Sequence, residues 1–558
     1  MARTTADRTT SSPGLAPHTR LIFIGLMLGM LVAAVSQTIV SPAMPIIVAE
    51  LGGIEHYSWL ATAAMLAAAV VVPIVGKLSD IYGRRSFYIG GLVVFMLGSI
   101  LSGLAQDFWW LVGARTIQGL GMGALMTLSQ TIIGDIIPPR QRGKYQGYMG
   151  AIFGLTSIAG PLVGGWITDT WGWRWLFYAG LPFGVVALVF IVKYLHLPHA
   201  QRKASIDVAG ILTLSGSLVA ILLATSWGGS TYPWGSTQVI GLYVVGALLL
   251  AAFIPIELRA EEPVLPLRLF RSSIFTFSNI AGLGVSMGMF GAIFYIPVYA
   301  QGVLGVSATN SGAIVIPMSV AMIVVGIVAG LLITRTGHYK PFVVAGTLIM
   351  LAGFWLLTRV HFGSSQLELS LAMVVVGVGL GAAQQTFTLV VQNSVDRRDL
   401  GVATAATQFF RSAGGTVGIA VLGTIMTSRL ATAIPRYLPA GAADSLPEGG
   451  IGAGSVLDPA ALAQLPPDIA TAVRQGLADA LHGVFVAAIP LVLVAVVASL
   501  LIKAIPLRTT LETPVPAEEA AAAGAGALGA GPISDVAEPR PTTPGTTGTG
   551  GSGRPQER

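Results

Sequence analysis

Two arginines lie inside long apolar runs of the sequence, where a charge is costly. Arg115 lies about seven residues into the run 109–134, and Arg411 lies within the run 402–427. A central arginine in a membrane helix costs roughly 2.5–3.5 kcal/mol on insertion scales. Such a side chain is tolerated when it faces water, a partner or a ligand. Each arginine is therefore a candidate for ion coupling or substrate recognition, and a structural clamp between helices is the alternative.

Uncharged polar and aromatic side chains occur in the same kind of run. A glutamine in a membrane helix is costly unless its amide is satisfied, so it faces the helix bundle or a wet cavity. The candidates for a cavity wall are Tyr295, Gln384, Gln385, Gln408 and Phe409. Hydrogen bonding between helices is the alternative for the glutamines, and packing is the alternative for the aromatic residues.

The sequence lacks the clusters that catalysis would need. Cysteine is absent, which excludes disulfides, thiolate metal sites and a cysteine nucleophile. We find no paired carboxylates, no metal-ligand spacing and no nucleophile–base set. None of the 25 acidic residues falls at the centre of an apolar run. We therefore expect neither an enzyme nor a metal or cofactor site.

The chain as a whole has the composition of an integral membrane protein. Of its 558 residues, 53% are hydrophobic and 10% are charged, whereas soluble domains carry about 25% charged residues. A membrane span needs about 20 mostly apolar residues. Fourteen runs approach that length: 21–47, 58–76, 87–105, 109–134, 146–168, 176–195, 208–227, 238–256, 275–300, 310–333, 341–358, 369–391, 402–427 and 481–502. We predict an all-α integral membrane fold.

Positive charge is distributed unevenly between the two sides of these spans. With the N-terminus in the cytoplasm, the cytoplasmic loops and tails hold 24 of the 31 Lys and Arg residues, and the opposite side holds five. The positive-inside rule then places both termini in the cytoplasm, and we expect the protein in the plasma membrane. Because the positive charge is spread over short loops, a nucleic-acid partner is not expected.

A weak internal repeat suggests two related halves. Gly76, Leu78 and Gly83 recur as Gly330, Leu332 and Gly337, at an offset of 254. Repeated halves are common in secondary transporters. The predicted divisions are a tail at 1–20, a six-helix half at 21–195, two inserted helices at 196–260, a second half at 261–505 with an external loop at 428–480, and a disordered tail at 506–558.

Three motifs carry a family resemblance. Gly76–Arg85 resembles the loop 2–3 signature of the major facilitator superfamily, G-x-L-x-D-x-x-G-R-R. The segment 111–119, with Arg115 and Gln118, resembles its second motif. The segment 160–165, with Gly160, Pro161, Gly164 and Gly165, resembles the motif that is associated with exporters of this superfamily. With fourteen spans, residues 20–505 resemble the drug:proton antiporter branch of this superfamily.

The first motif, by this resemblance, implies a conformational latch between inward-open and outward-open states. Its members would be Gly76, Asp80, Gly83, Arg84, Arg85 and Asp135. Asp80 would face the N-terminus of a helix from the other half, where the helix dipole stabilises an anion. Arg84 would pair with Asp135. The alternative is that these are ordinary charges that set the topology.

The exporter motif acts through shape. Pro161 cannot donate to the carbonyl of Ser157, so the helix is expected to bend there. Gly160 and Gly164, four residues apart, allow another helix to pack closely. The bearing of this motif on the direction of transport is implied by the resemblance.

One position departs from the family pattern. Ser36 stands where this branch usually carries an acid in helix 1. A carboxylate near the midplane is the simplest way to couple substrate to proton. Without it, the alternatives for Arg115 are a pairing with Gln37 or with an anion of the substrate. Proton coupling is implied by the resemblance alone.

The expected function is export of small amphipathic compounds, as in drug or antibiotic efflux, by a monomer that exchanges them for protons. Alternating access of the two halves would move the substrate across the lipid bilayer. A cavity without midplane acids favours neutral, zwitterionic or anionic amphiphiles over strong cations. Export of a lipid or glycolipid is the alternative function.

Overall fold

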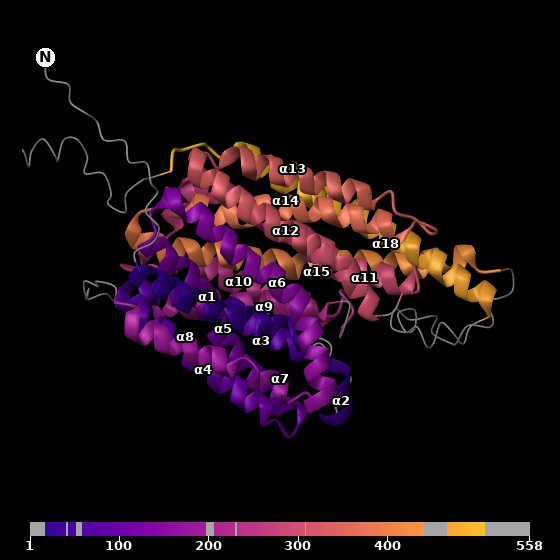
Figure 1. The fold of residues 1–558 in the computed structure, drawn as a ribbon, viewed down its shortest axis with the longest axis horizontal. Coiled ribbons are helices and arrows are strands. Elements are labelled where there is room, and N and C mark those ends of the chain that lie inside the picture. The colour runs from indigo at the N-terminus through magenta and orange to yellow at the C-terminus, as the bar shows by residue number, and fades with distance from the viewer. Residues whose placement is uncertain are drawn as a thin grey trace, which may run out of the picture. The chain divides into compact units, whose positions relative to one another are not determined.

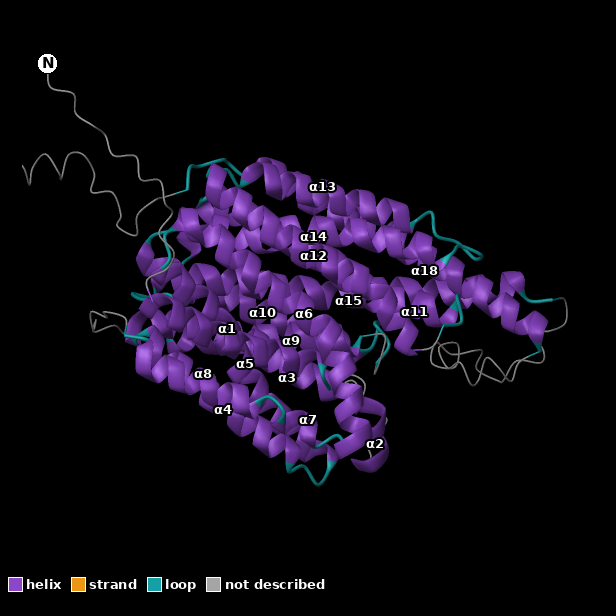
Figure 2. Cartoon of the chain, in the orientation of Figure 1, coloured by secondary structure: helices purple, strands orange, loops and turns teal. Residues whose placement is uncertain are grey.

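A computed structural model describes residues 17–40, 43–51, 59–196, 206–228, 232–306, 308–439 and 466–507. These residues form helices joined by short loops, apart from one isolated bridge between Gly228 and Tyr232 (Figure 2). The all-α prediction is thereby confirmed. Most of the N-terminal tail 1–20 and nearly all of the C-terminal tail 506–558 lie outside the described residues.

The helices follow the order expected from the apolar runs. The first part contains α1 (Pro17–Thr38), α2 (Met44–Leu51), α3 (Trp59–Tyr82), α4 (Arg84–Gly103), α5 (Phe108–Ile136), α6 (Pro139–Trp171), α7 (Trp175–Tyr178) and α8 (Leu181–Tyr194). Next come α9 (Val208–Trp227) and α10 (Thr237–Arg259). The last part contains η3 (Leu267–Arg271), α11 (Ser273–Gly302), α12 (Ala308–Thr336), α13 (Lys340–Leu357), α14 (Gln366–Ser394), η4 (Arg397–Asp399), α15 (Leu400–Tyr437) and α18 (Pro467–Leu501).

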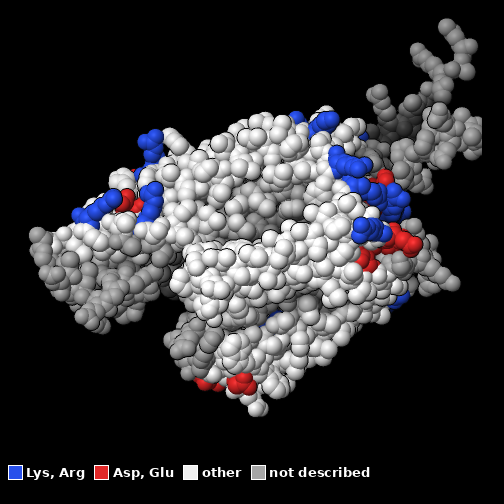
Figure 3. Space-filling view, turned by 180° about the vertical axis from the view of Figure 1, so that it is seen from behind, with Lys and Arg blue, Asp and Glu red and all other residues white. Residues whose placement is uncertain are grey.

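Thirteen helical segments of the described chain are long and apolar enough to cross a membrane. Helix α5, with 29 residues, is also long enough to cross a membrane and would be the fourteenth span. It packs against α3 and α4. Its glycines and its polar residues, which include Arg115, Gln118, Gln130 and Asp135, make it less hydrophobic than the other thirteen. On the face drawn in Figure 3, charged side chains gather toward the two ends and a white band separates them. The chain is a multi-pass membrane protein.

The buried apolar residues form separate clusters. One cluster is drawn entirely from residues 274–507, and two others are drawn from residues 22–195. A smaller cluster joins α9 and α10 through Leu214, Leu218 and Phe253. Helix α6 lies along α12, and α3 packs against α15, so these two pairs connect the first part of the chain to the last (Figure 1). The proposed division into halves agrees with this arrangement and remains a prediction.

The first predicted span was drawn too long. The run 21–47 was expected as one helix, but α1 ends at Thr38 and α2 begins at Met44. Pro45 is the second residue of α2, and proline is favoured in the first turn of a helix because the N–H that it lacks has no partner there. Glu50 anchors α2 by accepting hydrogen bonds from Trp173 Nε1 at 2.7 Å and Arg174 at 2.6 Å. The bonds from Arg174 and then Trp173 lower the pKa of the exposed Glu50 carboxyl.

The predicted external loop 428–480 is shorter than expected. Helix α15 continues to Tyr437 and α18 begins at Pro467, while residues 440–465 lie outside the described ranges. The extended parts pack on each other, since a Cβ at Gly476 would lie 2.7 Å from the Cα of Ile434. The Ala-rich composition that marked a loop also favours helix once a packing partner is present.

Candidate functional site

Three charged residues meet where α3, α4 and α5 end or begin on the side predicted to be cytoplasmic. Arg84 Nε donates to Asp135 Oδ2 at 2.5 Å, and the same guanidinium pairs with Asp80. Arg84 also donates to Ser79 Oγ at 3.1 Å. Each charged side chain is only 9% exposed. Two carboxylates therefore share one guanidinium in a buried cluster, which we call the charged latch: Asp80, Arg84 and Asp135.

The charged latch contacts the N-terminus of α15, which belongs to the last part of the chain. Asp80 Oδ2 accepts a hydrogen bond from the backbone N–H of Val402 at 3.1 Å. An anion at this position is stabilised by the dipole of α15. Gly76 permits the approach, because a Cβ there would lie 2.5 Å from Ala405 Cβ and 3.0 Å from the Gly401 carbonyl oxygen. Gly83, at φ 101°, makes the turn between α3 and α4.

Arg85 lies outside this cluster. It donates to the carbonyl oxygen of Val192 at 2.7 Å and so joins α4 to α8. Adjacent residues of a helix point about 100° apart, which separates Arg85 from Arg84. The resemblance placed both arginines in the latch, and the structure brings only Arg84 to it.

The second copy of the repeat makes a matching contact without charge. Gly330 lies 254 residues after Gly76, and a Cβ on it would overlap the carbonyl oxygen of Gly143 in α6. Thr334 lies 254 residues after Asp80, and its Oγ1 accepts from the backbone N–H of Lys144 at 3.0 Å. We call this contact between α12 and α6, in which Thr334 takes the place of Asp80, the neutral contact.

Arg115 is held by neutral partners on three helices. It donates to Gln118 Oε1 at 2.6 Å, to the Leu60 carbonyl oxygen at 3.3 Å and to Ser36 Oγ at 3.4 Å. Gln118 in turn donates to Ser99 Oγ at 2.7 Å. Arg115 is 5% exposed. This geometry ties α5 to α1, α3 and α4, which is what a structural clamp does.

Gln37 does not take the place of the missing acid. It is exposed, while its neighbour Ser36 is buried and in contact with Arg115. Because successive helical residues point about 100° apart, only one of the two faces α5. Of the two alternatives for Arg115, the pairing with Gln37 is not formed in this structure, and the pairing with a substrate anion remains a prediction.

Two glycines of the exporter motif lie against the end of α1. A Cβ on Gly160 would overlap Thr38 Oγ1, and one on Gly164 would overlap the Ile39 carbonyl oxygen. A Cβ on Gly165 would meet no atom within 4 Å, so that glycine is not needed for packing. Helix α6 runs without interruption through Pro161. The bend expected there remains a prediction.

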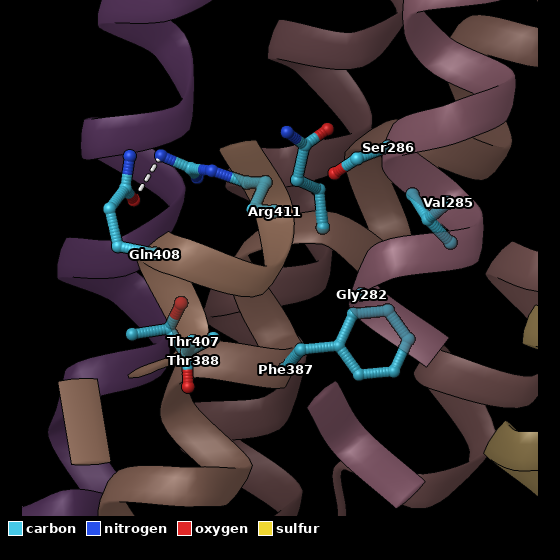
Figure 4. A pocket seen from close by; sticks show the side chains of 9 residues that line it. Gly282, Val285, Ser286, Phe387, Thr388, Thr407, Gln408 and Arg411 are labelled. Atoms are coloured by element: carbon cyan, nitrogen blue, oxygen red, sulfur yellow. Dashed lines mark hydrogen bonds between the residues drawn. The ribbon is translucent and has the colours of Figure 1, made fainter. Parts of the chain in front are cut away.

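A cavity lies beside Arg411, between α11, α14 and α15 (Figure 4). It is lined by Gly282, Val285, Ser286, Gln384, Phe387, Thr388, Thr407, Gln408 and Arg411. Arg411 donates to Gln408 Oε1, one turn earlier on α15. Its Cζ lies 5.3 Å from the centre of the Phe153 ring on α6. Arg411 therefore reaches from the last part of the chain to the first.

Only two of the five residues predicted for the cavity wall line this cavity, namely Gln384 and Gln408. Gln385 faces α6, where a Cβ on Gly150 would lie 3.1 Å from its Cγ. Tyr295 donates to the Ile419 carbonyl oxygen at 2.9 Å and joins α11 to α15. Phe409 packs with the cluster of α9 and α10. Tyr295 and Phe409 contact neighbouring helices, which was the alternative stated for aromatic residues. Gln385 lines a second small pocket between α6, α12 and α14, and its Oε1 has no hydrogen-bond partner among the described residues.

Comparison with known proteins identifies the family. The family model described as Major Facilitator Superfamily matches residues 26–419. The chain belongs to the major facilitator superfamily. It is 39% identical over 518 residues to the multidrug transporter protein MdtP of Bacillus subtilis (strain 168), covering 89% of this chain and 95% of MdtP. Multidrug resistance protein 3 of the same strain is 36% identical over 427 residues, covering 76% and 82%.

Solved structures of this superfamily show the same fold. The proton:xylose symporter XylE bound to 6-bromo-6-deoxy-D-glucose aligns with a TM-score of 0.56 at 14% identity, covering 89% of this chain and 98% of XylE. The human organic anion transporter MFSD10 aligns with a TM-score of 0.55 at 15% identity, covering 86% and 100%. The protein is thus a membrane transporter of the major facilitator superfamily, related to multidrug exporters.

Sequence reasoning missed several residues of this transporter. Ser286, Phe387 and Thr407 line the cavity beside Arg411, and Phe153 covers the arginine. These are common residues of membrane helices, so their types alone gave no signal. Thr334 was within reach, because the 254-residue offset that relates Gly76 to Gly330 also leads from Asp80 to Thr334.

Proposed function

We propose that this transporter exports small amphipathic compounds by alternating access, as a monomer in the plasma membrane with both termini in the cytoplasm. Proton antiport drives the cycle. The multidrug transporters among its relatives support the substrate class. The excess of Lys and Arg in the predicted cytoplasmic loops supports the orientation.

The observation that carries this proposal is the hydrogen bond from Val402 to Asp80, at 3.1 Å between the last and first parts of the chain. It joins α3 to α15 at the side predicted to be cytoplasmic, so it holds that side closed. Opening the cytoplasmic side requires this bond to break. The charged latch therefore favours the conformation in which the substrate site is shut off from the cytoplasm.

The coupling proton needs a carboxylate that changes its surroundings during the cycle. Among the acids of the described spans, Asp80 and Asp135 are buried at a contact between the two parts of the chain. Two carboxylates beside one guanidinium leave one negative charge without compensation, which favours taking up a proton. This arrangement supports the charged latch as the place of proton coupling, because Ser36 occupies the position where related transporters usually carry an acid.

The test is transport by the purified chain in proteoliposomes. An acidic lumen is expected to drive accumulation of fluorescent amphipathic drugs by molecules inserted inside out, because protons leave as the drug enters. An equal response to a sodium gradient alone would contradict proton coupling. Movement of a fluorescent phospholipid, with none of a broad drug panel, would contradict drug export and favour the lipid or glycolipid alternative.

A further inference from the structure

The guanidinium of Arg411 has no carboxylate partner among the described residues. The guanidinium donates a hydrogen bond to the neutral amide oxygen of Gln408 on the same helix. A guanidinium carries five N–H donors, so most of its donors remain available to a ligand. The other contact given for this group is with the ring of Phe153, whose centre lies 5.3 Å from Arg411 Cζ.

The depth of Arg411 makes its charge unusual. It lies eleven residues after Leu400, the first residue of α15, which is about 17 Å of helix. The hydrocarbon core of a bilayer is about 30 Å thick, so Arg411 lies near its centre. A charge at this depth requires a partner. None of the acidic residues in the sequence lies at the centre of a predicted span to provide one.

The cavity presents further polar atoms without partners. Ser286 is fully buried, and its Oγ has no hydrogen-bond partner in the described structure. Gln384 Oε1 is likewise buried without a partner. Figure 4 shows Ser286 and Phe387 among the side chains around this cavity, with the Arg411 guanidinium directed toward Gln408. A Cβ on Gly282 would meet no atom within 4 Å.

We infer that this cavity binds the carboxylate of a small amphipathic anion. The carboxylate accepts two N–H bonds from Arg411, the geometry that a planar guanidinium favours. The Ser286 hydroxyl donates a further hydrogen bond, and the apolar body of the ligand packs on Phe387 and Val285. This assignment rests on the proposed export function and names its substrate class as weak organic acids.

Arg115 does not compete for this role. Its guanidinium already donates to Gln118, Leu60 and Ser36. It also lies about seven residues into the span on the opposite side of the membrane from the start of α15. The substrate anion is therefore assigned to Arg411 alone.

The test compares three probes of one shape on the purified full-length chain by isothermal titration calorimetry. The probes are 1-naphthylacetate, the neutral 1-naphthylacetamide and the cation 1-naphthylmethylammonium. The acetate is expected to bind about ten- to a hundredfold more tightly than the amide, as for hydrogen bonds to charged groups. Arg411→Gln is expected to abolish this difference. Arg411→Lys retains part of it, because lysine keeps the charge but loses the bidentate geometry.

Two variants serve as controls. Arg436→Gln removes an exposed arginine from the same helix and is expected to leave all three affinities unchanged. Gly282→Leu fills the cavity without changing its charge and is expected to weaken binding of the acetate and the amide alike. If Arg411 variants fail to fold, Gly282→Leu and Ser286→Ala carry the test, with Ser286→Ala weakening the acetate more than the amide.

Equal affinity for the acetate and the amide, or unchanged acetate binding by Arg411→Gln, would overturn the inference. The proteoliposome assay separates its failure from that of the proposed function. Export of the amide or the cation but not of the acetate would contradict only the substrate class. Absence of movement for every probe and every drug under either ion gradient would contradict the proposed function itself.

Discussion

The charged latch and the neutral contact are two versions of one arrangement. In both, a glycine of one helix lies against backbone of the other half: Gly76 near Gly401, and Gly330 near Gly143. In both, an oxygen four residues further on accepts a backbone N–H, from Val402 to Asp80 and from Lys144 to Thr334. Only the first carries buried charge. The close approach thus belongs to the repeat, whereas the charge belongs to one copy.

This difference suggests that the two contacts differ in how strongly they resist opening of the cytoplasmic side during the transport cycle. A hydrogen bond to an ionised group is roughly twice as strong as one between neutral groups. We therefore propose that the two contacts resist opening unequally, and that the charged latch dominates the balance between the closed and open cytoplasmic side. In this proposal, the neutral contact keeps α6 and α12 together while the charged latch opens.

The largest effect is expected from filling either glycine. Gly76→Leu and Gly330→Leu would both place side-chain atoms where the other helix lies, and overpacking costs about 1–3 kcal/mol or more. Transport in inverted vesicles is expected to fall at least tenfold in both. Gly90→Leu is the control, because a Cβ on Gly90 would meet no atom within 4 Å. A loss confined to one glycine would break the proposed equivalence.

Arg84→Ala should follow in size. It leaves Asp80 and Asp135 buried without their shared cation, and breaking a buried pair costs about 3–5 kcal/mol. The purified variant is expected to melt at a lower temperature and to transport slowly. Arg85→Ala removes a neighbouring arginine that bonds only the Val192 carbonyl in the described contacts. Equal melting temperatures for the two variants would show that Arg84 is not special.

Asp80→Asn is expected to have an intermediate effect. Asparagine keeps an oxygen that accepts from the Val402 N–H, but it carries no charge. The lost interaction between the charge and the dipole of α15 is worth about 0.3–2 kcal/mol. The transport rate should fall by up to about tenfold, while substrate affinity, measured by calorimetry, changes little. A parallel loss of affinity would place Asp80 in the substrate site instead of the latch.

The smallest effect is expected at Thr334. Thr334→Val keeps the shape and removes one neutral hydrogen bond, worth about 0.5–1.5 kcal/mol. The transport rate should stay within about threefold of the wild type. Thr334→Asp sharpens the comparison by giving the neutral contact a charge, and it is expected to slow the cycle more than Thr334→Val. A severe loss in Thr334→Val would show that the contacts contribute equally.

The sequence allowed the helices and the charged latch to be predicted because both have local signals. Apolar runs of membrane length mark the helices, and the motif around Asp80 fixes spacing within one loop. The cavity could not be predicted in the same way. Whether Gln384 or Gln385 faces Arg411 depends on how α14 is rotated, which packing with α6 and α12 decides. The start of a second helix at Met44 was signalled by Pro45, but the apolar length of 21–47 outweighed this signal in the prediction.

The most direct test measures both contacts in the same molecule by pulsed electron spin resonance. The chain has no cysteine, so spin labels report only on introduced sites. Tyr82→Cys with Arg398→Cys spans the charged latch, and Arg140→Cys with Thr336→Cys spans the neutral contact, all at exposed positions. We predict that Asp80→Asn increases the population with a long distance across the charged latch, and that Thr334→Val leaves that population unchanged. Equal shifts in both variants, or none in Asp80→Asn, would contradict the account.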